Sequence, residues 1–354
     1  MSAVDGLLGY CRAGFEPELA AEYTARAAEA GLGAYAKTER NSGVVQLLGA
    51  DGAGLAAALP WRDLVFARQS LRLLAELRGL DPRDRLTPLL AALSDRGLCF
   101  GDVWVEHPDS EAGRPLSGLA RAFGNALRPA LRRHGLLAPA EDARLPRLHV
   151  CLLAGDHALL AVADPKTTSP WPLGIPRLRI HGDAPSRSAA KLEEAITVLL
   201  DPDERARRLQ AGMYAADLGA APGGWSWILA RRYLRVWAID NGPLAESAHA
   251  TGLIEHVRAD GFRWQPPQTL EWMVCDMVEQ PRRVADRIAT WLREGWCRQT
   301  IFNLKLPMKK RWDETVLCLD LLRERTGMPL DIRARQLYHD REEITVYARR
   351  SRSE

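Results

Sequence analysis

The second half of the chain alternates short apolar runs with amphipathic segments, and this alternation constrains the fold more than any other sequence feature. Residues 213–218, MYAADL, have the pattern of a buried strand, and residues 225–233 have helical spacing. Between them lies a turn of small residues and glycines, LGAAPGGW. A strand, a glycine turn and a helix in succession are typical of the nucleotide crevice of an open α/β sheet.

More units of the same kind follow along the chain. Apolar runs predict strands at 235–240, 254–260, 271–276 and 299–306, and amphipathic spacing predicts helices at 187–200, 282–296 and 313–327. We therefore predict an α/β fold, a Rossmann-like domain with a doubly wound and mostly parallel sheet. The last two strand patterns, 330–338 and 342–350, are typical of an antiparallel hairpin at the sheet edge.

The glycine turn differs from the common phosphate-binding patterns. It reads Asp-x-Gly-x-x-Pro-Gly-Gly, which is neither Gly-x-Gly-x-x-Gly nor a P-loop. Asp217 at the strand end disfavours a pyrophosphate, and Pro222 removes a backbone donor that a phosphate would use. Gly219, Gly223 and Gly224 allow a ligand to approach the backbone closely. The turn therefore suits a ligand that is cationic or rich in hydrogen-bond donors.

Acidic residues also follow the next two predicted strands. Asp240 could accept both hydroxyls of an adenosine ribose, and Asp260 could meet an adenine amino group. Together with Asp217, these acids fit S-adenosylmethionine, which carries an ammonium, a sulfonium and an adenosine. The alternative is that each acid only caps the helix after its strand. Three such acids beside one glycine turn favour the cofactor.

The segment DLGAAPGGW closely resembles motif I of the FtsJ-like ribose 2′-O-methyltransferases. Those enzymes carry a Lys-Asp-Lys-Glu tetrad, and the resemblance assigns its members in chain order to Lys191, Asp276, Lys305 and Glu343. They stand in SRSAAKLEEA, WMVCD, IFNLK and REEITVYARR. Glu342 is adjacent to Glu343, so the last assignment could shift by one residue. We prefer Glu343 because the family's glutamate immediately precedes an apolar strand.

The resemblance covers residues 186–354, nearly half of the chain. FNLKLPMKKRW, ARQLYHDREE and the additional N-terminal half are closer still to a bacterial subgroup that methylates a cytidine ribose in 23S rRNA. Ala221 stands where related sequences often have cysteine, at a contact that would be made by the backbone. The resemblance implies that the cofactor is lined by Ser188, Ala221, Pro222, Gly223, Gly224, Asp240, Asp260 and Asp276.

Methyl transfer to a sugar hydroxyl needs a base, because that hydroxyl is a very weak acid. Lys305 is our candidate, and it must be neutral to act. Burial, the Lys191 ammonium and the cofactor's sulfonium would lower its pKa, whereas Asp276 and Glu343 would raise it. Arginine could not replace it, and only six of the 48 basic residues are lysine. We expect the acids to position the two amines and the cofactor's charge to favour neutral Lys305.

Basic side chains in two segments predict contacts with rRNA phosphates. One is the cluster of Lys309, Lys310 and Arg311, which follows the last tetrad strand. The other is a stripe on the predicted helix 116–137, formed by Arg121, Arg128, Arg132 and Arg133. A solvated loop and an ordinary solvated helix face are the alternatives for these two segments.

The chain divides by composition into four parts. The pattern of residues 1–60 predicts a small α+β module. Residues 61–168 resemble a THUMP domain, which is an RNA-binding module. Residues 169–185 are rich in proline and glycine and predict a linker to the catalytic domain, 186–354. The order of elements in the first half suggests one or two small modules rather than a single long sheet. Its clearest elements are helices at 16–32 and 85–98, strands at 42–49 and 99–108, and a hairpin at 147–163.

Several classes of protein are disfavoured. The chain has no apolar run long enough for a transmembrane helix and no signal-peptide pattern at its start, so we expect a cytoplasmic protein without membrane contact. Its six cysteines are scattered without a Cys-x-x-Cys pair, so we expect neither a metal site nor disulfides. No feature demands a dimer, and a monomer is expected. The net charge of +3 permits binding to nucleic acid without requiring it.

Three functions remain in competition at this point. The first is an RNA ribose methyltransferase acting on 23S rRNA. The second is a methyltransferase for another RNA, a protein or a small molecule, which would leave the two lysines unexplained. The third is a non-catalytic RNA-binding or ribosome-assembly protein, which the complete tetrad disfavours. A nicotinamide-dependent dehydrogenase is disfavoured by the turn pattern.

Overall fold

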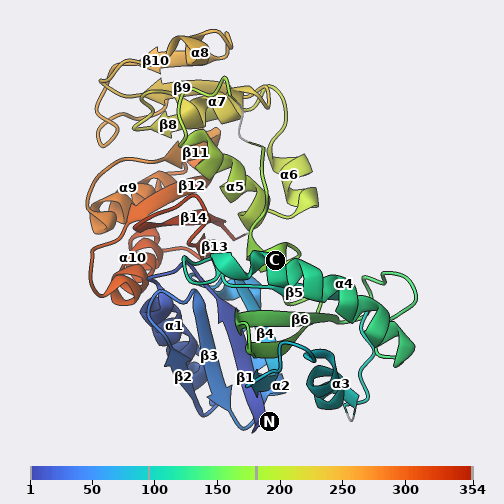
Figure 1. Cartoon of the computed structure of the whole chain (residues 1–354). Coiled ribbons are helices and arrows are strands. Elements are labelled where there is room, and N and C mark those ends of the chain that lie inside the picture. The colour runs from blue at the N-terminus through green and yellow to red at the C-terminus, as the bar shows by residue number, and fades with distance from the viewer. Residues whose placement is uncertain (1, 95, 180–181, 352–354) are drawn as a thin grey trace. The chain divides into compact units, whose positions relative to one another are not determined.

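The structure is a computed structural model that describes residues 2–94, 96–179 and 182–351 (Figure 1). The chain divides into two compact units, Met1–Ile175 and Pro176–Glu354. Each unit is built on its own seven-stranded sheet. No described helix combines the length and the apolar character needed to cross a membrane.

The first unit is an α+β structure whose strands are ordered β2-β3-β1-β4-β7-β6-β5. All neighbouring strands are antiparallel except β5 and β6. Helices α1 and α2 contact strands β1 to β4, while α3 contacts β4 and α4 contacts β5. Its elements are β1 (Ser2–Tyr10), α1 (Glu16–Glu29), β2 (Ala34–Thr38), β3 (Val44–Gly49), α2 (Gly52–Ala58), β4 (Gln69–Arg78), α3 (Leu86–Ser94), β5 (Asp102–Glu106), α4 (Ser117–Arg133), β6 (Arg147–Ala154) and β7 (His157–Ala163), with short 3-10 turns at 61–63, 114–116 and 172–174.

This continuous sheet corrects the expectation of small modules without a single long sheet. Strand β4 pairs with β1 on one side and with β7 on the other, and so joins strands on both sides of residue 60. The division at residue 60 remains a prediction. The helix, strand and hairpin patterns recognised in this half agree with α1, β3, α3, β5, α4 and the β6–β7 hairpin.

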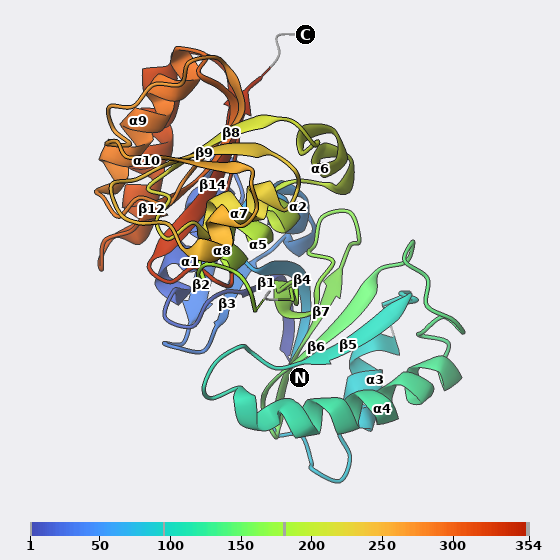
Figure 2. The same cartoon turned by 90° about the horizontal axis from the view of Figure 1, so that it is seen from above.

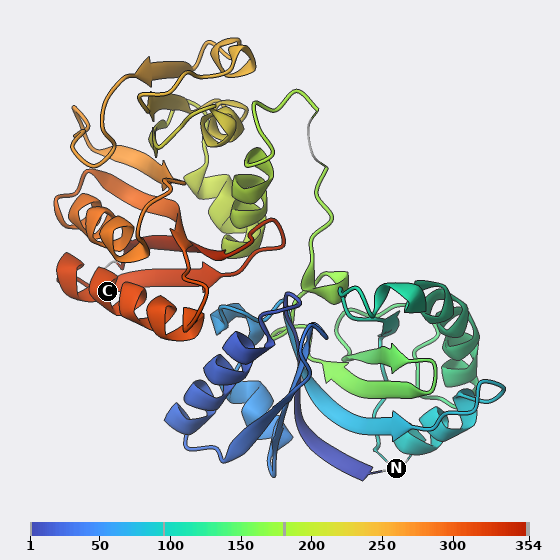
Figure 3. The same ribbon diagram turned by 60° about the vertical axis from the view of Figure 1, so that its left-hand side comes forward.

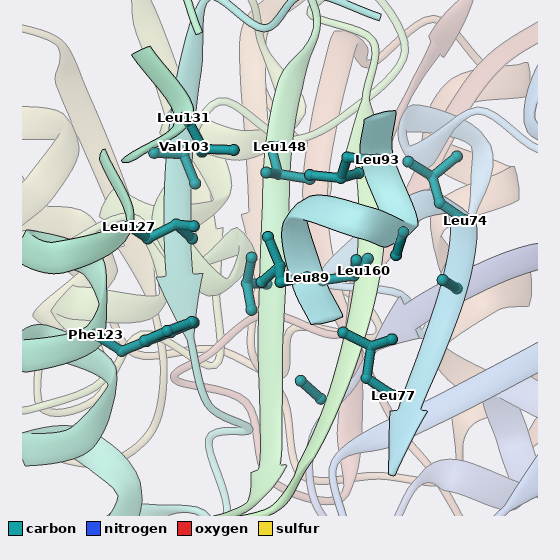
Figure 4. Packing of buried hydrophobic residues seen from close by; sticks show 14 of the residues in the cluster. Leu74, Leu77, Leu89, Leu93, Val103, Phe123, Leu127, Leu131, Leu148 and Leu160 are labelled. Carbon is teal, nitrogen blue, oxygen red and sulfur yellow. The ribbon is translucent and has the colours of Figure 1, made fainter. Parts of the chain in front are cut away.

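A leucine-rich core holds α3 and α4 against this sheet (Figure 4). Phe123, Leu127 and Leu131 repeat along α4 at intervals of four residues, so they share one helix face and point toward the sheet. Leu148 and Leu160 stand on β6 and β7 and are fully buried. Burying such side chains contributes roughly 1.5–3 kcal/mol each.

The second unit has the predicted doubly wound sheet, in the order β10-β9-β8-β11-β12-β14-β13. The first five strands in this order are parallel to one another. Strand β14 is antiparallel to both of its neighbours, β12 and β13. Helices α9 and α10 cover one face and α5 and α7 the other (Figure 2). Its elements are α5 (Ala189–Leu199), α6 (Pro202–Arg208), β8 (Tyr214–Leu218), α7 (Gly224–Ala230), β9 (Arg235–Ile239), α8 (Glu246–His249), β10 (Ile254–Val257), β11 (Leu270–Cys275), α9 (Pro281–Arg293), β12 (Cys297–Lys305), α10 (Arg311–Thr326), β13 (Leu330–Arg335) and β14 (Glu343–Arg350).

The strand order places a topological switch point between β8 and β11. From β8 the chain proceeds outward to β9 and β10, and it then returns to lay β11 on the other side of β8. Ligands of open α/β sheets bind at the carboxyl ends of the strands that flank such a point. Asp217 lies at the end of β8 and Asp276 directly follows β11, so both acids belong to this edge.

The predicted antiparallel hairpin is present, but only β13 is an edge strand. Strand β14 inserts between β12 and β13, with Lys305 opposite Glu343 in register. The start of the predicted linker 169–185 packs with the first unit, where the Leu173 amide donates to Glu106 Oε1 at 2.7 Å. The chain passes from the first unit to the second after Ile175 (Figure 3).

Candidate active site

The turn after β8 brings backbone close to three neighbouring segments. Gly219 and Gly223 have φ angles of 77° and 108°, which favour glycine. A Cβ at Gly219 would lie 2.6 Å from Met277 Cγ, and one at Gly223 would lie 2.8 Å from Ala248 Cβ. A Cβ at Gly224 would lie 2.7 Å from Ser188 Oγ. The glycines are therefore required by sterics, because a side chain at these positions would collide with the segments packed against the turn.

Asp217 is buried beneath this turn. Its Oδ2 accepts a hydrogen bond of 2.7 Å from Ser226 Oγ, whereas its Oδ1 has no partner among the described residues. Burial raises the pKa of Asp217 to about 7, and the charges of Asp276 and Asp240 add to the rise, against the lowering effect of Ser226. The unsatisfied oxygen would accept a donor from a bound ligand, because buried polar atoms are rarely left without partners.

Two more predicted cofactor residues lie against the same turn. Asp240 follows β9 and accepts the amides of Ala221 at 3.0 Å and Gly242 at 2.7 Å, so it fixes the shape of the turn. Ser188 precedes α5, and its carbonyl accepts the Trp225 indole N–H at 3.0 Å. This bond ties the start of α5 to the start of α7.

Asp260 differs from the other acids in its surroundings. It follows β10, its side chain is about half exposed, and its Oδ1 accepts the Phe262 amide at 2.9 Å. A Cβ on the adjacent Gly261 would lie 3.9 Å from the Gly219 amide nitrogen, so this loop reaches the glycine turn. Asp260 therefore closes its own loop at the edge of the predicted cofactor site, and the described residues that directly follow it form no helix for it to cap.

The four residues of the predicted tetrad come from four elements and meet at one place. Lys191 Nζ, from the first turn of α5, lies 3.6 Å from Asp276 Oδ2 and pairs with Glu343 Oε1. Lys305 Nζ, at the end of β12, lies 2.6 Å from Asp276 Oδ1 and pairs with Glu343 Oε2. Each carboxylate thus bridges both ammonium groups, and the four formal charges cancel.

The structure distinguishes the two adjacent glutamates. Glu343 is the first residue of β14, is 4% exposed and contacts both lysines. Glu342 points elsewhere and accepts two hydrogen bonds, of 2.9 and 2.6 Å, from the Arg311 guanidinium. Consecutive residues of a strand face opposite sides, so only one of the two glutamates can join the cluster.

Lys305 is partly buried, and its charge state depends on two opposing effects. Burial lowers the pKa of Lys305, but Asp276 and Glu343 outweigh it and raise this pKa above its ordinary value. The protein alone therefore holds Lys305 as an ammonium. An additional positive charge beside the cluster would be needed to favour the neutral amine.

The basic residues predicted to contact RNA have different environments. Lys309 and Lys310 are exposed, whereas Arg311 begins α10 and is held by Glu342. On α4, Arg121, Arg132 and Arg133 are exposed. Arg128 turns back to β5, where it pairs with Asp102 at 2.7 Å and donates to the Val103 carbonyl at 2.9 Å. Arg128 therefore supports the fold.

Three buried residues around the site were not among the predicted ones. Ser226 binds Asp217, Asn303 donates to Asp276 Oδ1 at 2.9 Å, and Thr345 donates to Asn303 Oδ1 at 2.7 Å. In the sequence, such residues could be recognised only as polar residues inside an otherwise apolar strand, as in IFNLK and EITVY. That signal is weak in a sequence, because such residues are also common on solvated faces.

Three protein-family models match parts of this chain. Residues 4–71 match the RlmM ferredoxin-like domain, and residues 84–164 match the N-terminal region of ribosomal RNA large subunit methyltransferase M. Residues 184–300 match the FtsJ-like methyltransferase family. The THUMP resemblance of residues 61–168 remains a prediction.

Two relatives of this chain, both from Xanthomonas, carry the name ribosomal RNA large subunit methyltransferase M. Ribosomal RNA large subunit methyltransferase M of Xanthomonas campestris pv. campestris (strain B100) is 66% identical over 347 residues, which are 98% of this chain and 100% of the relative. The protein of the same name from Xanthomonas axonopodis pv. citri (strain 306) is 65% identical over the same shares. The solved structure of TrmN from Thermus thermophilus aligns with 97% of this chain and 99% of that chain, at 19% identity and a TM-score of 0.36. The full-length identity shows that this chain belongs to the ribosomal RNA large subunit methyltransferase M family, whose members are S-adenosylmethionine-dependent methyltransferases.

Proposed function

We propose that this protein methylates the ribose 2′-hydroxyl of a cytidine in bacterial 23S rRNA, with S-adenosylmethionine as methyl donor and Lys305 as general base. The observation that carries the proposal is the position of Lys305 at the carboxyl edge of the sheet. There it contacts Asp276 and Glu343. Asp276 follows β11, which lies between β12 and β8, and the glycine turn follows β8. Family membership supports the rRNA substrate, and that substrate in a bacterium favours a cytoplasmic enzyme. We expect it to act as a monomer.

The residues at the turn fit S-adenosylmethionine. Asp217 Oδ1 is a buried acceptor without a partner among the described residues, and it lies beneath the glycine turn at the carboxyl end of β8. Asp240 would hold the adenosine ribose, with its carboxylate already fixed by two backbone amides. Asp217 would accept donors of the amino acid part or face its positive charge. The remaining contacts would come from Ser188, Ala221, Pro222, Asp260 and Asp276.

The tetrad performs the proton chemistry. Bound S-adenosylmethionine supplies an electrophilic methyl group on a cationic sulfur. Lys305 Nζ would take the proton of the 2′-hydroxyl while the 2′-oxygen bonds to the methyl carbon. The bond from that carbon to sulfur would break, and the sulfur would leave as a neutral thioether with the electron pair. Asp276 and Glu343 hold the amine of Lys305 in place, and Lys191 balances their negative charge. The tetrad is neutral overall, so the cofactor's positive charge would lower the pKa of Lys305 and favour the free amine.

The test is methyl transfer from labelled S-adenosylmethionine to 23S rRNA transcribed in vitro, with the wild type and Lys305→Ala compared. A 2′-O-methyl group blocks alkaline cleavage, so the modified ribose can be mapped. We expect label at one alkali-resistant cytidine in the wild type and its loss in Lys305→Ala, with cofactor binding intact. No label on RNA despite cofactor binding would contradict the substrate. Label that survives in Lys305→Ala would contradict the role of Lys305.

A further inference from the structure

A row of three buried polar side chains leads from the interior to the tetrad. Asp340 lies in the loop between β13 and β14, Thr345 is on β14 and Asn303 on β12, and all three are fully buried. Asn303 and Thr345 are register partners across the two strands. Asn303 Nδ2 donates to Asp276 Oδ1 at 2.9 Å, on the same oxygen that Lys305 contacts. The row therefore ends on a tetrad carboxylate.

The hydroxyl of Thr345 has close contacts on two sides. Its Oγ1 lies 2.7 Å from Asn303 Oδ1, and it lies 3.0 and 3.3 Å from the two carboxyl oxygens of Asp340. A hydroxyl carries one proton and can donate it in only one direction. If Thr345 donates to Asn303 Oδ1, any hydrogen bond between Thr345 and Asp340 has to be donated by Asp340, whose Oδ2 also accepts the Leu337 amide at 2.9 Å. An ionised carboxylate has no proton to donate.

Each of the other proton arrangements places two hydrogen-bond acceptors opposite each other. If Thr345 donated to Asp340, two acceptor oxygens would face each other at 2.7 Å between Thr345 and Asn303. Turning the Asn303 amide over would restore that bond, but it would place the amide oxygen 2.9 Å from Asp276 Oδ1. Both alternatives bring two oxygen acceptors together in a buried site, which is costly.

We infer that Asp340 is held as a neutral carboxylic acid and that, through Thr345 and Asn303, it positions the carboxylate of Asp276 against Lys305. The hydrogen bonds then run in one direction, from Asp340 to Thr345, from Thr345 to Asn303 and from Asn303 to Asp276. The protonation of Asp340 stands on this geometry alone. The consequence for methyl transfer rests on the function proposed above.

The surroundings of Asp340 agree with the neutral form. Burial raises the pKa of Asp340 well above its ordinary value, and Glu343 and Glu194 raise it further, while the Leu337 amide and Lys191 lower it. An ionised Asp340 would add a third carboxylate behind two lysines. It would raise the pKa of Lys305 and oppose the formation of the neutral base.

The first test measures the protonation of Asp340 without RNA. Infrared difference spectra of the wild type against Asp340→Asn, at neutral pH, report the carbonyl stretch of a protonated carboxyl group. We expect this band in the wild type and its loss in Asp340→Asn. Spectra that differ only in carboxylate bands would overturn the inference. This readout does not require methyltransferase activity, so it separates the inference from the proposed function.

The second test separates positioning from folding with conservative variants. Thr345→Val removes the hydroxyl at nearly constant volume, while Thr345→Ser and Asp340→Asn keep a neutral donor at each place. We expect Thr345→Val to lower kcat about tenfold or more, since small misplacements of reacting groups have effects of this size. The KM values should not change. The rise of kcat with pH should move to higher pH, because Asp276 would bind the Lys305 proton more strongly and so raise the pKa of Lys305.

The controls decide between the possible causes. Thr345→Ser and Asp340→Asn should stay within about threefold of the wild-type kcat, a difference of less than 1 kcal/mol in barrier height. Thr300→Val makes the same substitution in β12, at a buried hydroxyl that contacts the Met273 sulfur, and should leave kcat unchanged. A wild-type kcat and pH profile in Thr345→Val would overturn the inference. An equal loss in folded Asp340→Asn would show that Asp340 acts as an anion.

Discussion

At the scale of single residues, the balance of charge around Lys305, the proposed base, is expected to set the pH dependence of methyl transfer. Burial lowers its pKa, and Asp276 and Glu343 raise it above the ordinary value. A general base must be deprotonated, so the rate should rise with pH as Lys305 loses its proton. The two carboxylates are therefore expected to shift this rise to higher pH. The same carboxylates hold the Lys305 amine in place.

Glu343→Gln tests this balance. Removing one anion lowers the pKa of Lys305, so the rise of kcat should move to lower pH, although the maximal kcat should fall by about 10-fold to 100-fold as positioning is lost. The measurement is kcat from about pH 6 to about pH 10, where a lysine with a perturbed pKa titrates. Glu342→Gln makes the same change one residue away, at the partner of Arg311, and should keep the wild-type profile. An unchanged profile in Glu343→Gln would contradict Lys305 as the base.

Asp217 links the cofactor site to stability. Burial raises its pKa from 3.8 to about 7, so the folded state binds its proton more tightly than the unfolded chain does. The stabilising contribution is complete below the unfolded pKa, and it is lost as pH rises through the interval from 3.8 to about 7. Ionised Asp217 therefore lowers the stability of the fold above about pH 7. Such a buried, perturbed carboxylate is typical of a ligand-binding site.

Asp217→Asn should therefore stabilise the protein at alkaline pH and weaken the cofactor. We expect the free energy of unfolding in urea to rise by a few kcal/mol at most near pH 8, since one pKa unit corresponds to about 1.4 kcal/mol. Below the ordinary pKa of aspartate the two proteins should match. Binding of S-adenosylmethionine, measured by calorimetry, should weaken. The exposed Asp320→Asn serves as control. Equal stability of Asp217→Asn and wild type at all pH values would contradict the raised pKa.

The tetrad was predicted from the resemblance to the FtsJ-like family, because the motifs that carry this resemblance are local segments of sequence. Asp276 and Lys305 end apolar strands, and Glu343 begins one. The choice between Glu342 and Glu343 required the register of β14, which only pairing with β12 fixes. The roles of Asn303 and Thr345 could not be predicted, because a hydrogen bond between strands 42 residues apart has no local signal.

At the scale of elements, the glycine turn after β8 is the part most sensitive to substitution. Gly223→Ala combines a φ of 108° with a Cβ 2.8 Å from Ala248 Cβ, so α8 would have to shift. Such backbone strain costs on the order of 1–3 kcal/mol. We expect a lower melting temperature and a weaker affinity for S-adenosylmethionine. Gly252→Ala has a φ of 67° and open space around its Cβ, so it reports the strain alone. Equal effects of the two substitutions on cofactor affinity would contradict a role of the turn in binding.

Of the three strands of the first unit that escaped prediction, β1 and β4 share one structural feature, whereas the described pairing of the edge strand β2 contains no register shift. Strands β1 and β4 lie in the interior of the first sheet, and each contains a register shift, between Ala3 and Gly6 and between Leu73 and Ala75. A bulge changes which side chains face the core, so the alternation that marks a strand is interrupted. In β4 the leucines at 71, 74 and 77 even follow helical spacing. The parallel strands of the second unit carry no such shift and were recognised.

At the scale of the whole molecule, the chain has two units of different architecture. The second unit holds the complete tetrad and the glycine turn, and the first unit carries the exposed arginines of α4. A large rRNA substrate presents far more phosphates than one catalytic edge can meet. The first unit is therefore expected to supply part of the RNA affinity through charge.

The arginines of α4 allow a matched test of this division. Replacing the exposed Arg121 and Arg133 by alanine should weaken rRNA binding and reduce the slope of log affinity against log salt by about 0.7–0.9 for each phosphate that the variant no longer neutralises. Affinity for S-adenosylmethionine and thermal stability should not change. Arg128→Ala should behave in the opposite way, because Arg128 binds Asp102 and the Val103 carbonyl and so secures α4 on β5. It should lower the melting temperature and leave the salt slope nearly intact. A wild-type salt slope in the double variant would show that RNA does not contact this face of α4, and would restrict the electrostatic contacts to other surfaces such as Lys309 and Lys310.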